Sequence, residues 1–132
     1  NFKGKADAAL EALKKGSDFV YIHVEAPDES GHRYEIENKV KSIELIDNQI
    51  VAYLKEELDK SGMDYKMMVL PDHPTPLSLR THTSEPVPFV IYQSNAESSG
   101  TSLTYDEFSA EKTGLYIQQG HKLMDLFIHG KI

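Results

Sequence analysis

A run of six residues at positions 19–24 constrains the fold of this chain most strongly. It is a stretch of apolar, β-branched and aromatic side chains interrupted only by one histidine (FVYIHV). Such a short run is typical of a strand that is covered on both faces. The preceding residues 5–15 place alanines and leucines among charges and end at Gly16, a pattern that predicts a surface helix. A helix that leads into a buried strand is typical of α/β domains.

The longest predicted element is a helix over residues 34–60, which Gly62 is expected to end. Its apolar side chains recur at intervals of three, four or seven residues with charged residues between them. The apolar positions are Ile36, Val40, Ile43, Ile50, Leu54 and Leu58. One face of this helix is therefore expected to pack on the core, and the charged face is expected to lie in solvent.

Two further strands are predicted at residues 66–70 and 87–92. The stretch between them is rich in proline and has no helical period, so it is a poor crossover for a parallel pair and favours an antiparallel return. A polar loop at 95–102 and short helices at 105–111 and 122–128 complete the chain. The predicted fold class is α/β, with a mixed, mostly parallel sheet flanked by helices.

The composition limits the kind of protein. With 132 residues and 39% hydrophobic side chains, the chain fits a single domain over residues 1–132. A net charge of −7 without a basic cluster argues against nucleic acid as a partner, and no apolar run is long enough for a membrane span. The absence of cysteine fits a reducing compartment, and we expect a cytoplasmic location. The oligomeric state is not readable from the sequence.

Five candidate metal ligands lie next to the predicted strands. Asp28 and His32 follow the first strand, Asp72 and His73 follow the second, and His82 precedes the third. The carboxyl ends of parallel strands form the functional edge of an open α/β sheet, and the antiparallel return would bring His82 to the same edge. Imidazole and carboxylate groups hold the metals of hydrolytic and phosphoryl-transfer enzymes, so the pattern predicts a divalent metal site.

Each part of this set also has a simpler interpretation. Asp28 and His32 are four residues apart and would share one face of a helical turn, but Asp28 or Ser30 could instead cap the long helix. Asp72 and His73 could be an ordinary turn after a strand, and His82 alone could have no function. The metal hypothesis depends on the convergence of all three loops.

The remaining histidines are weaker candidates. His23 lies within the first predicted strand and is expected to be a core histidine with a bonded neighbour. His121 and His129 flank the last predicted helix, where surface or helix-end charge is the expected role. Glu25 is expected to act at most indirectly, through a ligand or a bound water.

Long segments of the chain resemble one enzyme family. Residues 23–32 (HVEAPDESGH) and 39–47 (KVKSIELID) are similar to the first metal-binding segment of the archaeal-type cofactor-independent phosphoglycerate mutases. Residues 71–92 (PDHPTPLSLRTHTSEPVPFVIY) are similar to the second such segment. The similarity runs through nearly the whole chain, including residues 108–115 (FSAEKTGL) and the last helix.

The resemblance implies a member of the alkaline phosphatase superfamily, with an α/β/α sandwich and two divalent ions, commonly manganese, magnesium or zinc. It implies that Asp28, His32 and His82 bind one ion, and that Asp72 and His73 form part of the shell of the other. In the family the remaining ligands of this second ion are an N-terminal aspartate and the serine nucleophile, and neither has a counterpart here.

The resemblance also implies that residues 1–132 are the C-terminal part of the metal-binding domain, without the N-terminal part and the inserted substrate-binding domain. The chain begins with Asn1 rather than methionine, which agrees with this interpretation. No catalytic residue is assigned, because the nucleophile is expected in the missing part. Ser30, Ser78 and Thr83 are interpreted as loop or capping residues.

Three hypotheses for the function follow. The first is a phosphoglycerate mutase that interconverts 2- and 3-phosphoglycerate through a phosphoserine and takes a phosphorylated small molecule as its substrate. The second is a related metalloenzyme with another substrate, such as a homoserine kinase-like enzyme or a phosphatase. The third is an inert metal-binding fragment. The isolated chain is expected to bind at most one divalent ion well and to show no mutase turnover.

Overall fold

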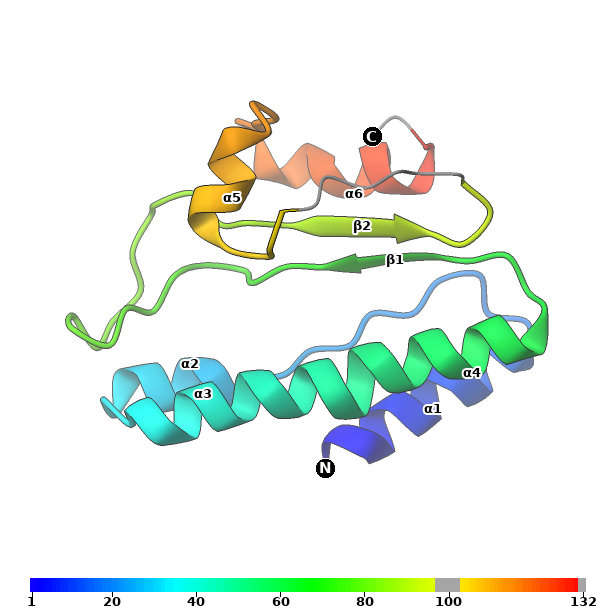
Figure 1. Ribbon diagram of the computed structural model, residues 1–132, viewed down its shortest axis with the longest axis horizontal. Helices are drawn as coiled ribbons and strands as arrows, with labels where there is room; N and C mark the ends of the chain where they lie inside the picture. Colours follow the sequence, from blue (N-terminus) through cyan, green and yellow to red (C-terminus); the bar gives the residue numbers. More distant parts are fainter. Residues whose placement is uncertain (97–102, 131–132) are drawn as a thin grey trace.

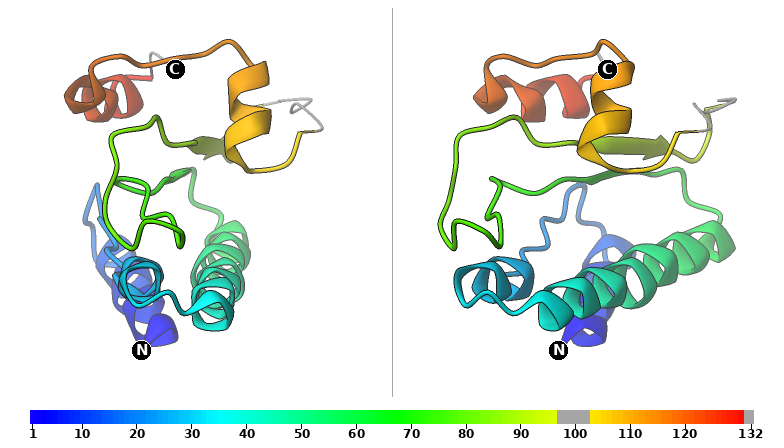
Figure 2. Two further views of the ribbon diagram at one scale, coloured as in Figure 1. Left: turned by 90° about the vertical axis from the view of Figure 1, so that its left-hand side faces the viewer. Right: turned by 60° about the vertical axis from the view of Figure 1, so that its left-hand side comes forward.

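Helices lie on both sides of a pair of strands in the computed structural model, which describes residues 1–96 and 103–130 (Figure 1). The elements are α1 (Phe2–Lys14), α2 (Ala26–His32), α3 (Ile36–Leu45), the π-helical segment η1 (Ile46–Ala52), α4 (Tyr53–Ser61), β1 (Lys66–Val69), β2 (Val90–Gln93), α5 (Glu107–Lys112), the 3₁₀ turn η2 (Gly120–Lys122) and α6 (Leu123–Ile128). The helices α1 to α4 lie on one side of the strands and α5 and α6 on the other (Figure 2).

The two strands confirm the predicted return of the chain. β1 and β2 are antiparallel, with Lys66 opposite Gln93 and Val69 opposite Val90. The prediction of a mostly parallel sheet is not confirmed, because the described residues contain this antiparallel pair and no other sheet. The α/β class holds in its coarse form, with helices packed around a small sheet.

The predicted strand at residues 19–24 is wrong for this structure. The segment is extended, but among the described residues its backbone pairs with no neighbouring strand, which a strand requires. Its side chains alternate, because Ile22 and Val24 pack on the core while Phe19 and Tyr21 are 46% and 65% exposed. One face of the segment is therefore covered, where the sequence predicted that both would be.

The core lies between α1 and the second half of the long helix. Its buried members are Ala6, Leu10, Ile50, Leu54 and Leu58. Met67 of β1 packs against this cluster from the side of the strands. The extended segment and β1 are thus held over the helices by apolar contact.

The long helix runs without interruption from α3 through η1 to α4 and confirms the predicted helix over 34–60. Gly62 ends it in the left-handed conformation, with φ of 77°, which glycine adopts without steric cost. Its charged face lies in solvent and carries ion pairs such as Lys55–Asp59 at 2.9 Å. Only the second half of its apolar stripe is buried, since α1 packs against η1 and α4 while α3 packs against α2.

The chain ends follow local sequence signals. The side chain of Asn1 accepts a hydrogen bond from the Gly4 amide at 3.0 Å and caps α1, so this helix begins earlier than predicted. The short helices α5 and α6 confirm the two predicted near the C-terminus, and Asp106 caps α5.

Residues 97–102 of the predicted polar loop lie outside the described residues. In the part of the chain that is described, no helix is both long and apolar enough to cross a membrane.

Candidate metal centre

Helix α2 places two of the candidate ligands on one face. Pro27 lies in its first turn, where a missing backbone donor costs nothing, and the helix ends at His32. Asp28 and His32 are one turn apart, and Oδ2 of Asp28 lies 3.4 Å from Nε2 of His32. The alternative that Asp28 or Ser30 caps the long helix is wrong, because the N-cap of α3 is Glu35 and both residues lie inside α2.

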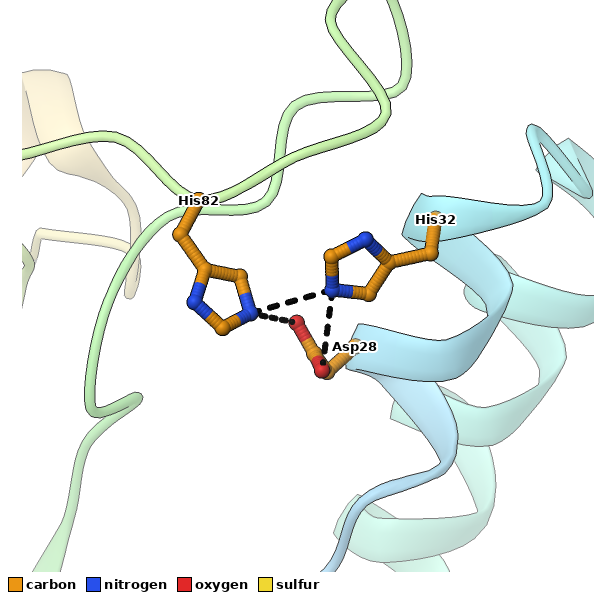
Figure 3. Close-up of side chains that lie close together, drawn as sticks. All are labelled: Asp28, His32 and His82. Atoms are coloured by element: carbon orange, nitrogen blue, oxygen red, sulfur yellow. Dashed lines mark hydrogen bonds and ion pairs between the residues drawn. The ribbon is translucent and has the colours of Figure 1, made fainter.

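The loop between the strands brings a third candidate to the same point. Nε2 of His82 lies 3.0 Å from Oδ1 of Asp28 and 3.0 Å from Nε2 of His32 (Figure 3). Figure 3 shows both rings directing a nitrogen toward the carboxylate, one from α2 and one from the loop. Ligand atoms of the three residues all lie within 4.8 Å of one another. Residues that are up to 54 positions apart in the sequence therefore form one cluster of donor atoms.

A hydrogen bond at Nδ1, on the side of the ring away from Asp28, fixes the orientation of His32. Its Nδ1 lies 2.9 Å from the carbonyl oxygen of Arg80, and because a carbonyl only accepts, Nδ1 carries the proton. A neutral His32 then presents the lone pair of Nε2 to His82 and Asp28. The guanidinium of Arg80 lies over the ring of Tyr34, 4.8 Å from its centre, and both residues adopt left-handed backbone conformations with φ of 55°.

Thr75 supports the carboxylate and was not identified from the sequence. It is 6% exposed, and its hydroxyl donates to Oδ1 of Asp28 at 2.5 Å. Partial burial of Asp28 opposes its charged form, but this hydrogen bond and the adjacent histidine rings outweigh that effect and hold the pKa of Asp28 below its ordinary value. Asp28 is therefore an ionised acceptor near neutral pH. The sequence offered no sign of this contact beyond the position of Thr75 between two prolines.

Lys39 of α3 lies behind Thr75. Its Nζ donates to the Thr75 carbonyl oxygen at 2.5 Å. Partial burial lowers the pKa of Lys39, although the carboxylates of Asp28 and Glu107 act in the opposite direction. α3 is thereby joined to the loop that carries His82.

The other two candidate ligands lie beside this cluster. The ring of His73 packs on the ring of His82, with 3.6 Å between the ring centres, and its Nδ1 lies 3.3 Å from the Thr75 hydroxyl. Oδ1 of Asp72 lies 3.3 Å from Nε2 of His73, and the Asp72 side chain is exposed. Of the five predicted residues, three thus converge on one point, His73 contacts them, and Asp72 contacts His73. Their role as metal ligands stays a prediction.

The remaining candidates lie elsewhere. The interpretation of His23 as a core histidine is wrong, since it faces outward from the extended segment and its side chain is 53% exposed. Its Nε2 lies 3.6 Å from Glu25, which is also exposed. His121 and His129 are exposed around α6, as predicted.

The donor set of the cluster fits a divalent ion. Two imidazoles and one carboxylate form a three-ligand set of the kind that catalytic zinc sites use, and nitrogen and oxygen donors also suit manganese. Two donors bound to a tetrahedral ion at 2.0–2.1 Å lie about 3.3–3.4 Å apart, close to the separations in this cluster. Nε2 of His32 faces both Nε2 of His82 and the carboxylate of Asp28, so an ion at this point could be bound by all three side chains.

A family model described as the metalloenzyme superfamily matches residues 1–129. The chain belongs to this superfamily. Among curated members, it is 44% identical over 97% of its length to a probable 2,3-bisphosphoglycerate-independent phosphoglycerate mutase of Geobacter sulfurreducens, and covers 32% of that protein. It is 41% identical over 99% of its length to the 2,3-bisphosphoglycerate-independent phosphoglycerate mutase of Methanosarcina barkeri, of which it covers 33%. The resemblance noted from the sequence is confirmed.

A solved structure has a similar fold. The structure of the PH0037 protein from Pyrococcus horikoshii matches 98% of this chain with a TM-score of 0.83 and 28% identity. The chain covers 38% of that structure and about a third of the length of the curated relatives it matches.

Proposed function

We propose that residues 1–132 are the C-terminal portion of a metal-dependent phosphoglycerate mutase that interconverts 2- and 3-phosphoglycerate through a phosphoserine. The observation that carries this proposal is the identity of 41–44% to mutases over nearly the whole chain. In this proposal the rest of the protein supplies the parallel strands of an α/β/α sandwich, the serine nucleophile and the substrate-binding domain.

Within the proposed enzyme, this chain supplies ligands for two divalent ions. Asp28, His32 and His82 would hold one ion, and Asp72 and His73 would form part of the shell of the other. Manganese, magnesium and zinc are the candidates, since the donors are imidazole nitrogens and carboxylate oxygens. Such ions, when bound, neutralise charge on the phosphoryl oxygens and lower the pKa of a nearby hydroxyl.

The contacts in the cluster support this role for the side chains. Asp28 is kept ionised beside Thr75, so it can accept a cation without first losing a proton near neutral pH. His32 is kept in one tautomer by the Arg80 carbonyl, so its Nε2 lone pair faces the same point as Asp28. These contacts hold the donor atoms in place, and donors that are already oriented bind an ion at lower cost.

The proposal is tested with the full-length protein that contains this chain. We expect conversion of 3-phosphoglycerate to 2-phosphoglycerate that is lost on chelation and restored by manganese or zinc. The variant His82→Ala should bind the ion more than about 100-fold more weakly, since even residues behind metal ligands contribute 10–100-fold. His121→Ala is the matched control, because His121 is exposed and lies in η2 beside α6, on the opposite side of the strands from α2 (Figure 2).

Two results would contradict the proposal. Release of inorganic phosphate, or transfer of phosphate to another alcohol, without formation of 2-phosphoglycerate would indicate a related metalloenzyme with another substrate. Calorimetric titration of the isolated 132-residue chain should show one bound ion and no mutase turnover, and an active isolated chain would show that the nucleophile lies within it.

A further inference from the structure

Two successive hydrogen bonds link the carboxylate of Asp28 to Thr75 and Thr75 to Lys39. The Thr75 hydroxyl donates to Oδ1 of Asp28, and Lys39 Nζ donates to the carbonyl of the same threonine, each at 2.5 Å. Thr75 lies between Pro74 and Pro76, whose rings restrict the backbone on either side. The position of the hydroxyl is therefore set by the loop on one side and by α3 on the other.

Helix α2 packs directly against this pair of contacts. A Cβ atom added to Gly31 would lie 2.7 Å from the Thr75 carbonyl oxygen and 3.0 Å from Lys39 Nζ. The backbone of α2 therefore lies so close to the carbonyl that no side chain fits between them at Gly31. Three elements, α2, α3 and the loop after β1, meet at Thr75.

The orientation of the carboxylate decides whether the three candidate ligands converge. Oδ1 of Asp28 faces His82 at 3.0 Å, and Oδ2 faces His32 at 3.4 Å. The terminal torsion of an aspartate is broad, so the backbone of α2 alone does not fix the direction of either oxygen. The Thr75 hydroxyl is the donor that holds Oδ1 on the side of His82.

We propose that Thr75 and Lys39 are positioning residues for the candidate metal centre, Thr75 by orienting the Asp28 carboxylate and Lys39 by holding the carbonyl of Thr75. This inference rests on the proposed metal site and adds two residues that are not themselves ligands. Its consequence is that metal affinity depends on a hydroxyl and an amine that lie behind Asp28 and do not contact the ion.

The test is calorimetric titration of the full-length protein with manganese and with zinc. Thr75→Val, which removes the hydroxyl at nearly constant shape, should weaken binding by about 10–100-fold, as is typical for partners of metal ligands. Thr75→Ser keeps the hydroxyl and should retain affinity close to that of the unmodified protein. Lys39→Met should weaken binding to a smaller extent, because it acts through the Thr75 carbonyl. Thr113→Val is the matched control, since its hydroxyl donates to Ala110 within α5 and is exposed.

Thermal unfolding of the metal-free variants separates positioning from general stability. A positioning role predicts that Thr75→Val and Thr75→Ser unfold at similar temperatures. Their metal affinities should nevertheless differ by about 10–100-fold. Unchanged affinity in Thr75→Val, or an equal loss in Thr75→Ser, would overturn the inference.

The same experiment distinguishes this inference from the proposed function. A protein that binds the ion in a Thr75-dependent way but does not form 2-phosphoglycerate would refute the mutase and leave the positioning residues in place. An active mutase with unaltered metal affinity in Thr75→Val would refute the positioning residues alone. A full-length protein that binds neither manganese nor zinc would refute both.

Discussion

At Gly31 the backbone of α2 contacts the carbonyl of Thr75 without an intervening side chain. An alanine at this position would place Cβ 2.7 Å from that oxygen, which belongs to a backbone restrained by two prolines. Glycine to alanine in an open helix is stabilising by up to about 1 kcal/mol, but overpacking costs about 1–3 kcal/mol. Because of the close contact, we expect the substitution to be destabilising overall.

We expect Gly31→Ala to lower the free energy of unfolding by about 1–3 kcal/mol, measured by urea denaturation. Gly120→Ala is the matched control, because nothing lies within 4 Å of its added Cβ and its φ is not left-handed. That variant should lie within about 0.5 kcal/mol of the unmodified chain. An equal response of the two glycines would mean that the contact at Thr75 is not tight in solution.

Asp106, at the start of α5, makes a pH-dependent contribution to the free energy of unfolding. Hydrogen bonds from the Thr104 hydroxyl and from the Ser109 amide hold its pKa below the ordinary value of 3.8. Because the folded pKa is depressed, the stabilisation is present above the ordinary value of 3.8 and is lost as the pH falls through the folded pKa.

We therefore expect the chain to be more stable than Asp106→Asn near pH 7, and this difference to disappear as the pH is lowered below 3.8. Urea denaturation of both proteins between neutral and acidic pH measures it. The asparagine keeps a capping side chain but cannot be ionised, so it isolates the charge. A difference that does not change with pH would contradict the assignment.

At the scale of elements, the long helix divides into a buried and an exposed half. Leu54 in α4 is 6% exposed within the core, whereas Val40 in α3 is 51% exposed, although both belong to one apolar stripe in the sequence. Leu54→Ala should lower the free energy of unfolding by about 2–5 kcal/mol, as is typical of leucine truncation in a core. Val40→Ala should change it by no more than about 0.5 kcal/mol. Chemical denaturation compares the two, and similar losses would mean that α3 is covered in solution.

The sequence predicted those elements best whose signals are local. The helix that ends at Gly62 and the short helix predicted at 105–111 depend on residues within one or two turns, so their positions could be predicted from the chain alone. The helical spacing of Asp28 and His32 belongs to the same class. The contact of Thr75 with Asp28 spans 47 residues, and no local pattern marks it. The strand expected at 19–24 also depends on partners distant in the sequence, so its apolar pattern alone did not decide its pairing.

At the scale of the whole molecule, the extended segment 19–24 gives a prediction about the proposed longer protein. Its inner side chains pack on the core, while Phe19 and Tyr21 are exposed and its backbone pairs with no strand among the described residues. An unpaired extended edge beside a sheet is a ready site for another strand. If these residues belong to the proposed mutase, strands from the remainder of the protein should pair with them and cover the outer face.

Hydrogen exchange can test this expectation directly. In the isolated chain the amides of residues 19–24 should exchange nearly as fast as in an unfolded peptide, because they lack backbone acceptors. In the full-length protein the same amides should be strongly protected, whereas those of α4 around Leu54 should be protected in both proteins and serve as the control. Fast exchange at 19–24 in the full-length protein as well would contradict the pairing and would leave this segment a loop, with its apolar sequence explained only by the contacts of Ile22 and Val24.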